Sequence, residues 1–184
     1  MNKVFGLISE YAPVREEGTR TVISYGFEAV DETNATWIEI YLPKKQNPMI
    51  GLKEVKEAII ADINKRTDEK ILTGFVYEDN DGVERNVWLS DENQRNYSEA
   101  QRLAALVGSK NYEPVTFKIG EDENERACYR TFETLNDLND FYFAVFAYIK
   151  QCLADGWAEK DSLDFGPYEE LFPTPEPQNN ENAE

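Results

Sequence analysis

The sequence contains no histidine, and only two cysteines and two methionines among its 184 residues. The absence of histidine removes the commonest general base, the usual catalytic triads and most zinc-based catalysis. Cys128 and Cys152 form no metal or redox motif by their spacing, and we expect both to serve as small core hydrophobes. We therefore expect a protein that is not an enzyme and that uses no cofactor and no metal ion.

Basic residues are also scarce, since 19 Lys and Arg stand against 36 Asp and Glu and leave a formal net charge of −17. This charge repels phosphate backbones and anionic lipid head groups, so we expect neither nucleic acid nor membrane as a partner. No apolar run approaches the ~20 residues that span a bilayer, and the N-terminal apolar run is too short for a signal peptide. We expect the protein to stay in a cytoplasm until it is assembled into a larger structure.

Hydrophobic residues make up 41% of the chain and aromatic residues 12%, which is enough for a packed core. Alternation of β-branched or aromatic residues with polar ones predicts strands over Lys3–Ile8, Arg20–Val30 and Ala35–Leu42. In the last of these strands we expect the aliphatic side chains, rather than those of Trp37 and Glu39, to face the core. A loop with Pro43, Pro48 and Gly51 then ends an N-terminal β module, residues 1–50.

The remaining chain alternates helical and hairpin patterns. Helical spacing predicts a helix from Leu52 to about residue 67. The two apolar runs that follow, Ile71–Tyr77 and Val83–Leu89, flank the turn signal Asn80-Asp81-Gly82 and predict a hairpin. Ser90 or Asp91 then caps a second helix, and the three-residue spacing of Asp91 and Gln94 allows a reciprocal cap.

A second predicted hairpin, Pro114–Ile119 with Ala127–Glu133, turns at the acidic segment 120–125. Thr134 caps the last predicted helix, which has the strongest apolar stripe in the chain. The stripe consists of Leu135, Leu138, Phe141, Tyr142, Val145, Phe146, Ile149 and Leu153, and Trp157 continues it. This helix should be the central core element.

From residue 172 the composition changes to an acidic tail rich in Pro and Asn, residues 172–184, which is expected to be flexible because it has too few apolar side chains to pack. We therefore predict an α+β fold in which antiparallel hairpins pack against about three helices over residues 51–171, preceded by the N-terminal β module.

The stretch from Trp88 to Tyr97 holds an unusual number of carboxamides between a strand pattern and a helical one. The favoured interpretation is a strand end, a helix cap and a first helical turn, in which Asp91, Asn93 and Gln94 satisfy backbone donors. The alternative is a protein-binding patch in which the two aromatic residues supply contact area and the polar ones adaptable hydrogen bonds. The candidate patch consists of Trp88, Asp91, Asn93, Gln94, Asn96 and Tyr97.

Three strings over about residues 57–161 resemble a domain of unknown function found in bacteriophage tail proteins and prophages of Bacteroidales. They are "TDEKILTGF" (Thr67–Phe75), "WLSDENQ" (Trp88–Gln94) and "CLADGWAEKD" (Cys152–Asp161). The resemblance implies a protein of the virion or of tail assembly that is made in the host cytoplasm, and it implies no catalytic residue. The N-terminal β module lies outside it.

The resulting hypothesis is a non-enzymatic virion structural protein, a tail or fibre-associated component. Its expected partners are other phage structural proteins, such as tail, fibre or collar subunits, and further copies of itself. It would dock through the edges of its N-terminal strands or through the candidate patch. The first alternative is a tail-fibre assembly chaperone that is not retained in the virion. A carboxylate-based glycan hydrolase is the least favoured alternative, because only the abundance of acidic residues motivates it.

Overall fold

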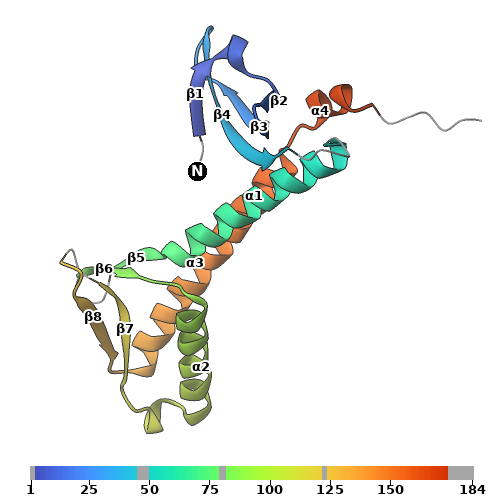
Figure 1. The fold of residues 1–184 in the computed structure, drawn as a ribbon. Helices are drawn as coiled ribbons and strands as arrows, with labels where there is room; N and C mark the ends of the chain where they lie inside the picture. Colours follow the sequence, from blue (N-terminus) through green and yellow to red (C-terminus); the bar gives the residue numbers. More distant parts are fainter. Residues whose placement is uncertain (1–2, 45–49, 79–81, 122–123, 174–184) are drawn as a thin grey trace, which may run out of the picture. The chain divides into compact units, whose positions relative to one another are not determined.

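The structure is a computed structural model that describes residues 3–44, 50–78, 82–121 and 124–173 (Figure 1). The protein is α+β, and its described strands form antiparallel sheets, so the predicted fold class is confirmed. The chain divides into two compact units. The first unit consists of residues 1–64 and 159–184, and the second of residues 65–158. This division differs from the predicted boundary at residue 50, because residues that follow the N-terminal strands pack with them.

The first unit is built on a four-stranded antiparallel sheet in the order β1-β4-β3-β2. The strands are β1 (Lys3–Leu7), β2 (Val14–Glu17), β3 (Arg20–Ala29) and β4 (Asn34–Pro43), and the short 3-10 helix η1 (Ile8–Glu10) follows β1. The sequence pattern predicted β1, β3 and β4 but missed β2. Three of the four residues of β2 are charged, so it carries no run of alternating apolar residues.

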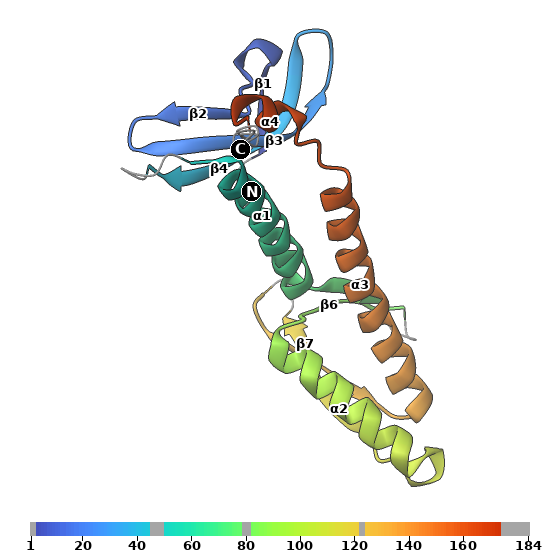
Figure 2. The same ribbon diagram turned by 90° about the vertical axis from the view of Figure 1, so that its right-hand side faces the viewer.

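Helix α1 (Leu52–Thr73) up to residue 64, the end of helix α3 from residue 159 and the short helix α4 (Gly166–Leu171) complete the first unit (Figure 2). Its buried core consists of Ile23, Tyr25, Val55, Ile59, Ile63 and Tyr168. The aliphatic side chains of β4 pack against this core as predicted, since Ile38 and Ile40 contact it. The prediction was wrong about the opposite face, because Trp37 and Glu39 are buried even more completely.

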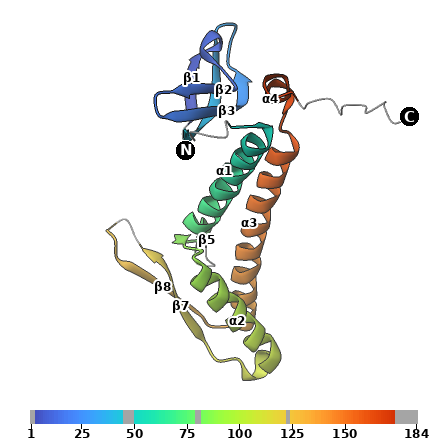
Figure 3. The same ribbon diagram turned by 45° about the vertical axis from the view of Figure 1, so that its right-hand side comes forward.

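The second unit contains two hairpins and the larger helices (Figure 3). Its elements, in addition to the last turns of α1, are β5 (Phe75–Glu78), β6 (Glu84–Val87), α2 (Asp91–Val107), the 3-10 helix η2 (Ser109–Asn111), β7 (Val115–Glu121), β8 (Ala127–Phe132) and α3 (Leu135–Asp161) up to residue 158. The N–H of Trp88 donates to the carbonyl of Ile119 at 2.9 Å and thereby links the two hairpins. Aromatic rings dominate the core, where Tyr97, Phe132 and Phe141 are fully buried.

Helix α1 is longer than the sequence pattern indicated, because Ile71–Thr73 are helical and not part of a strand. Ile71 lies eight positions after Ile63, so both side chains project from similar faces of the helix. Ile63 belongs to the core of the first unit and Ile71 to that of the second. Burial of Ile71 therefore accounts for the extra helical turn, and the chain enters β5 only after Gly74 at φ +80°.

The apolar stripe predicted for α3 is only partly buried. Leu138, Phe141 and Val145 lie in the core as expected, but Phe146 and Trp157 are exposed. The buried face continues instead through Cys152 and Gly156, and an added Cβ at Gly156 would collide with the side chain of Thr67 on α1. Close packing of two helices at these small residues leaves no room for a large side chain such as that of Trp157. The other cysteine, Cys128, is half-buried.

Three predicted features fall wholly or partly outside the described residues. They are the turn at Asn80 and Asp81, the centre of the acidic turn at residues 122–123, and the tail from residue 174 onward. Among the helices that are described, none combines the length and the apolar character required to cross a bilayer.

Candidate functional site

The corner between β6 and α2 carries the candidate patch. Ser90 is the N-cap of α2, and its hydroxyl accepts a hydrogen bond from the N–H of Asn93 at 3.2 Å. The side chain of Asn93 donates to the carbonyl of Trp88 at 3.1 Å, and that of Gln94 donates to the carbonyl of Leu89 at 2.7 Å. The reciprocal cap between Asp91 and Gln94 is not formed. Both carboxamides instead satisfy carbonyl groups of the segment that leads into the helix.

The two aromatic residues of the patch differ in accessibility. Trp88 is 39% exposed, and the ammonium of Lys118 lies 5.5 Å from the centre of its ring. Tyr97 is only 1% exposed and packs edge-to-face against Phe117 and Phe141, with ring centres 5.0 Å apart in each pair. Tyr97 is therefore a core residue that a docking partner cannot reach, and this part of the binding-patch hypothesis is wrong.

The hydroxyl of Tyr97 has an unusual environment. Its oxygen is buried and has no hydrogen-bond partner within the part of the chain that the structure describes. Burial raises the pKa of this phenol to about 12, because the charged phenolate would lie in an apolar surrounding.

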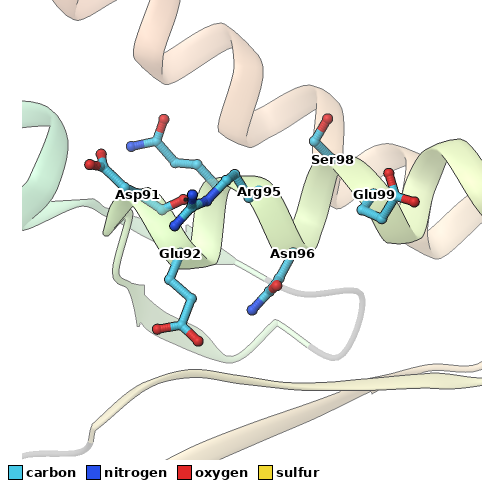
Figure 4. A pocket seen from close by; sticks show the side chains of 7 residues that line it. Asp91, Glu92, Arg95, Asn96, Ser98 and Glu99 are labelled. Atoms are coloured by element: carbon cyan, nitrogen blue, oxygen red, sulfur yellow. Dashed lines mark hydrogen bonds between the residues drawn. The ribbon is translucent and has the colours of Figure 1, made fainter.

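Asp91 and Asn96 are exposed on α2, where they border a shallow hollow (Figure 4). All the residues that line the hollow belong to α2 itself, namely Asp91, Glu92, Gln94, Arg95, Asn96, Ser98 and Glu99. Because no second element closes it, the hollow offers a polar surface and no enclosed binding site. Trp88, Asp91 and Asn96 are thus the members of the patch that a partner protein can contact.

Strand β1, at one edge of the first unit's sheet, presents a second accessible surface. Phe5 is 65% exposed and Leu7 47% exposed. Phe5 is paired with Thr36 of β4, so the two side chains lie on the same face of the sheet. Ile38, two positions after Thr36, lies on this face as well and packs against the core of the first unit. Both apolar side chains therefore lie on the core-facing side of the sheet, at its border, without cover from the described residues. We call Phe5, Leu7 and the outer edge of β1 the edge patch.

The backbone of β1 also has hydrogen-bonding groups on its outer side. The N–H of Ile8 donates to the carbonyl of Thr33, whereas that of Leu7 donates to the carboxylate of Glu10 at 3.1 Å. Because successive N–H groups of a strand point to opposite sides, those of Phe5 and Lys3 point away from β4, as that of Leu7 does. No described strand pairs with this side of β1. The edge patch thus combines exposed apolar side chains with outward backbone donors.

Comparison with known proteins identifies the family. A family model described as a domain of unknown function, DUF4376, matches residues 54–173, which is more than half of the chain. The chain belongs to this family. The match confirms that part of the chain is a domain of unknown function, as the resemblance implied. No curated protein and no solved structure matches the chain.

The DUF4376 match separates the two candidate surfaces. It includes the whole corner between β6 and α2, but it begins within α1 and leaves the edge patch outside.

Among the described residues of the DUF4376 protein, no group of three or more acidic or cysteine side chains is placed to hold a metal ion. Sequence reasoning predicted docking at the strand edges of the N-terminal module, which stays a prediction, and it did not single out Phe5 and Leu7. Their signal is the placement of two large apolar residues at alternate positions of a short strand.

Proposed function

We propose that this protein acts by docking on other proteins and not by catalysis, as a structural component of a bacteriophage virion associated with the tail or its fibres. In this proposal the edge patch is the principal docking surface, and the exposed residues of the corner, Trp88, Asp91 and Asn96, form a secondary one. The partners are other tail, fibre or collar subunits, or further copies of the chain. The protein is made in the host cytoplasm and ends in the particle.

The observation that carries the docking role is the exposure of Phe5 and Leu7 beside the outer backbone edge of β1, with which no described strand pairs. An unpaired strand edge accepts a strand of a partner, and apolar side chains next to it add buried area and specificity. Burial of two such side chains contributes roughly 1.5–3 kcal/mol each when it is complete. The placement in a phage tail rests on the resemblance of three strings, of which Trp88–Gln94 lies at the corner.

A pair of matched variants tests the docking role. The first carries Phe5→Ser and Leu7→Ser on β1, and the control carries Leu103→Ser and Leu106→Ser, which replace two exposed apolar residues of α2. Both proteins are expressed in a deletion strain, and particles are purified with tails separated from heads. Quantitative mass spectrometry should recover the unmodified chain and the control with the tails. The β1 variant should fall by about tenfold or more, as expected for loss of central apolar contacts.

The same experiment separates the alternatives. Recovery of the β1 variant at the level of the control would contradict docking through the edge patch. Absence of the unmodified chain from the particles, despite strong expression and with loss of fibre assembly on deletion, would contradict the structural role and favour the assembly chaperone. Circular dichroism of each variant checks that the serine substitutions leave the fold intact.

A further inference from the structure

A cavity of about 400 Å³ lies within the first unit, apart from the corner on α2. Its volume falls in the range of roughly 300–1,000 Å³ that is typical of small-molecule sites. The segment after η1, strand β3, helix α1, the end of α3 and helix α4 all contribute to its walls. Six residues matter for its chemistry: Tyr11, Tyr25, Phe27, Asp164, Phe165 and Tyr168.

Five aromatic rings, those of Tyr11, Tyr25, Phe27, Phe165 and Tyr168, line the cavity. The rings of Tyr11 and Phe27 have centres 4.8 Å apart at an interplanar angle of 55°, and those of Phe165 and Tyr168 lie 6.1 Å apart at 54°. Both pairs are tilted and not stacked flat on each other.

The tyrosine hydroxyls are bound to the protein itself. Those of Tyr168 and Tyr11 donate to the carbonyl of Ser24, the latter at 3.3 Å, and that of Tyr25 donates to Asp62 at 2.6 Å. Anchoring of the hydroxyls fixes the orientation of the rings, so little conformational freedom is lost when a ligand binds.

The charged groups around the cavity are acidic. Its lining includes Glu159 and Asp164 but no Lys or Arg. Oδ1 of Asp164 accepts a hydrogen bond from the N–H of Gly166 at 2.9 Å, and Asp164 makes no ion pair with any described residue. An anionic ligand would be repelled here. The two carboxylates do not belong to a group of three or more acidic or cysteine side chains that could hold a bare metal ion, since the described residues contain no such group.

An internal contact shows that one of these rings, that of Phe165, accepts a cation. The ammonium of Lys56, which is not part of the lining, lies 4.9 Å from the centre of the Phe165 ring and 2.9 Å from the carboxylate of Glu169. An ammonium at this distance from an aromatic ring, with a carboxylate beside it, is a cation–π arrangement.

We propose that the cavity binds a small organic cation, an alkylated ammonium group, with the rings around its apolar body and Asp164 beside its charge. Quaternary ammonium groups are the ligands that aromatic cages recognise best, because they are weakly hydrated and present methyl groups to the rings. This site is independent of docking at the edge patch. Its test uses binding in solution, which does not depend on whether the protein enters a virion.

Isothermal titration calorimetry of the full chain with choline and with 3,3-dimethylbutan-1-ol is the direct test. The alcohol has the same shape as choline but no charge, so their difference measures recognition of the cation. Choline should bind at least about fivefold more tightly than the alcohol, in line with cation–π interactions of roughly 1–2 kcal/mol. Equal affinity for the two, or no choline binding up to about 10 mM, which corresponds to a binding free energy weaker than about −3 kcal/mol, would overturn the proposal. This comparison needs no variant and so does not depend on the folding of a mutant.

Variants then locate the site. Asp164→Asn and Phe165→Leu should each weaken choline binding severalfold. Glu170→Gln, which removes one charge from helix α4 outside the lining, should leave the affinity within twofold of the unmodified chain. Unchanged affinity in a folded Asp164→Asn protein would overturn the assignment. A peptide that carries trimethyllysine distinguishes the source of the cation: tighter binding than choline assigns it to a partner's side chain, and equal or weaker binding assigns it to a free amine.

Discussion

Arg15 on β2 lies with Nη1 2.9 Å from Oε1 of Glu39 on β4, although β3 separates the two strands in the sheet. The carboxylate of Glu39 also accepts hydrogen bonds from the indole of Trp37 at 3.0 Å and the hydroxyl of Tyr41 at 2.7 Å. Burial on its own would raise the pKa of Glu39. The three hydrogen bonds and the positive charge of Arg15 outweigh burial and hold this pKa at about 2. The pair thus connects an edge strand to the centre of the sheet through a charge that must remain ionised.

This pair predicts a specific acid sensitivity of the first unit. The pKa of Glu39 is depressed on folding from its ordinary 4.5, so its stabilising contribution is complete above about pH 4.5 and is lost as the pH falls toward 2. Glu39→Gln should remove this part of the pH dependence. At pH 7 it should also lower the free energy of unfolding by about 2 kcal/mol, because Arg15 loses its charged partner.

Urea denaturation at several pH values between 2 and 7 would measure both effects, with hydrogen exchange of β3 and β4 as the local readout. Glu32→Gln is the control, since Glu32 is exposed in the turn between β3 and β4. Identical pH profiles for the Glu39→Gln protein and the unmodified chain would show that the pair does not stabilise the sheet.

Periodicity predicted most elements of this fold, but it could not detect those that depend on contacts distant in sequence. Amphipathic spacing located α2 and α3, and alternation located β3 and β4, because each has one face turned to a core. Alternation also located β1. The charged residues of β2 include two with partners distant in sequence: Arg15 pairs with Glu39, which lies 24 positions later, and Glu16 pairs with Lys44. Likewise, Trp157 matched the spacing of the α3 stripe, but the close approach of Gly156 to Thr67 directs the buried face elsewhere.

The candidate sites show the same limit of sequence reasoning. Local spacing placed Asn93 and Gln94 in the first turn of the helix, but the prediction that they satisfy backbone donors was wrong, because both side chains donate to carbonyls five residues earlier. The exposure of Phe5 and the aromatic cavity depend on which surfaces the rest of the chain covers. Tyr11 and Tyr168 approach the same carbonyl from opposite ends of the sequence, and no local pattern brings them together.

The two carboxamides Gln94 and Asn96 on α2 allow a matched test of the corner. Gln94 donates to the carbonyl of Leu89, whereas Asn96 is exposed and forms no hydrogen bond with a described residue. Gln94→Ala should lower the free energy of unfolding by about 1 kcal/mol, because a partly buried carbonyl loses its partner. Asn96→Ala should change it by less than about 0.5 kcal/mol. Urea midpoints at constant m-value would measure the difference, and equal losses would contradict a structural role for Gln94.

The buried hydroxyl of Tyr97 predicts that its removal is harmless to stability. Tyr97→Phe should leave the free energy of unfolding unchanged or raise it by up to about 1 kcal/mol, because a buried polar group without a partner is destabilising. Tyr168→Phe is the matched comparison, since that hydroxyl donates to the carbonyl of Ser24. It should lower stability by about 1 kcal/mol. Thermal unfolding of both variants tests this contrast, and a marked loss in Tyr97→Phe would indicate a bound water at the hydroxyl.

Gly74, between α1 and β5, predicts the most severe effect of a single methyl group. Its φ of +80° disfavours any other residue, and an added Cβ would overlap the carbonyl of Val87 on the paired strand β6. Gly108 provides the control, since it has a similar φ of +70° but no atom within 4 Å of an added Cβ. Gly108→Ala should therefore cost only the backbone strain, about 1 kcal/mol. Gly74→Ala should cost at least about 3 kcal/mol, because relief of the overlap requires separation of β5 from β6. Hydrogen exchange at Phe75 and Val87 would locate the damage, and equal destabilisation by the two substitutions would show that the strands separate without cost.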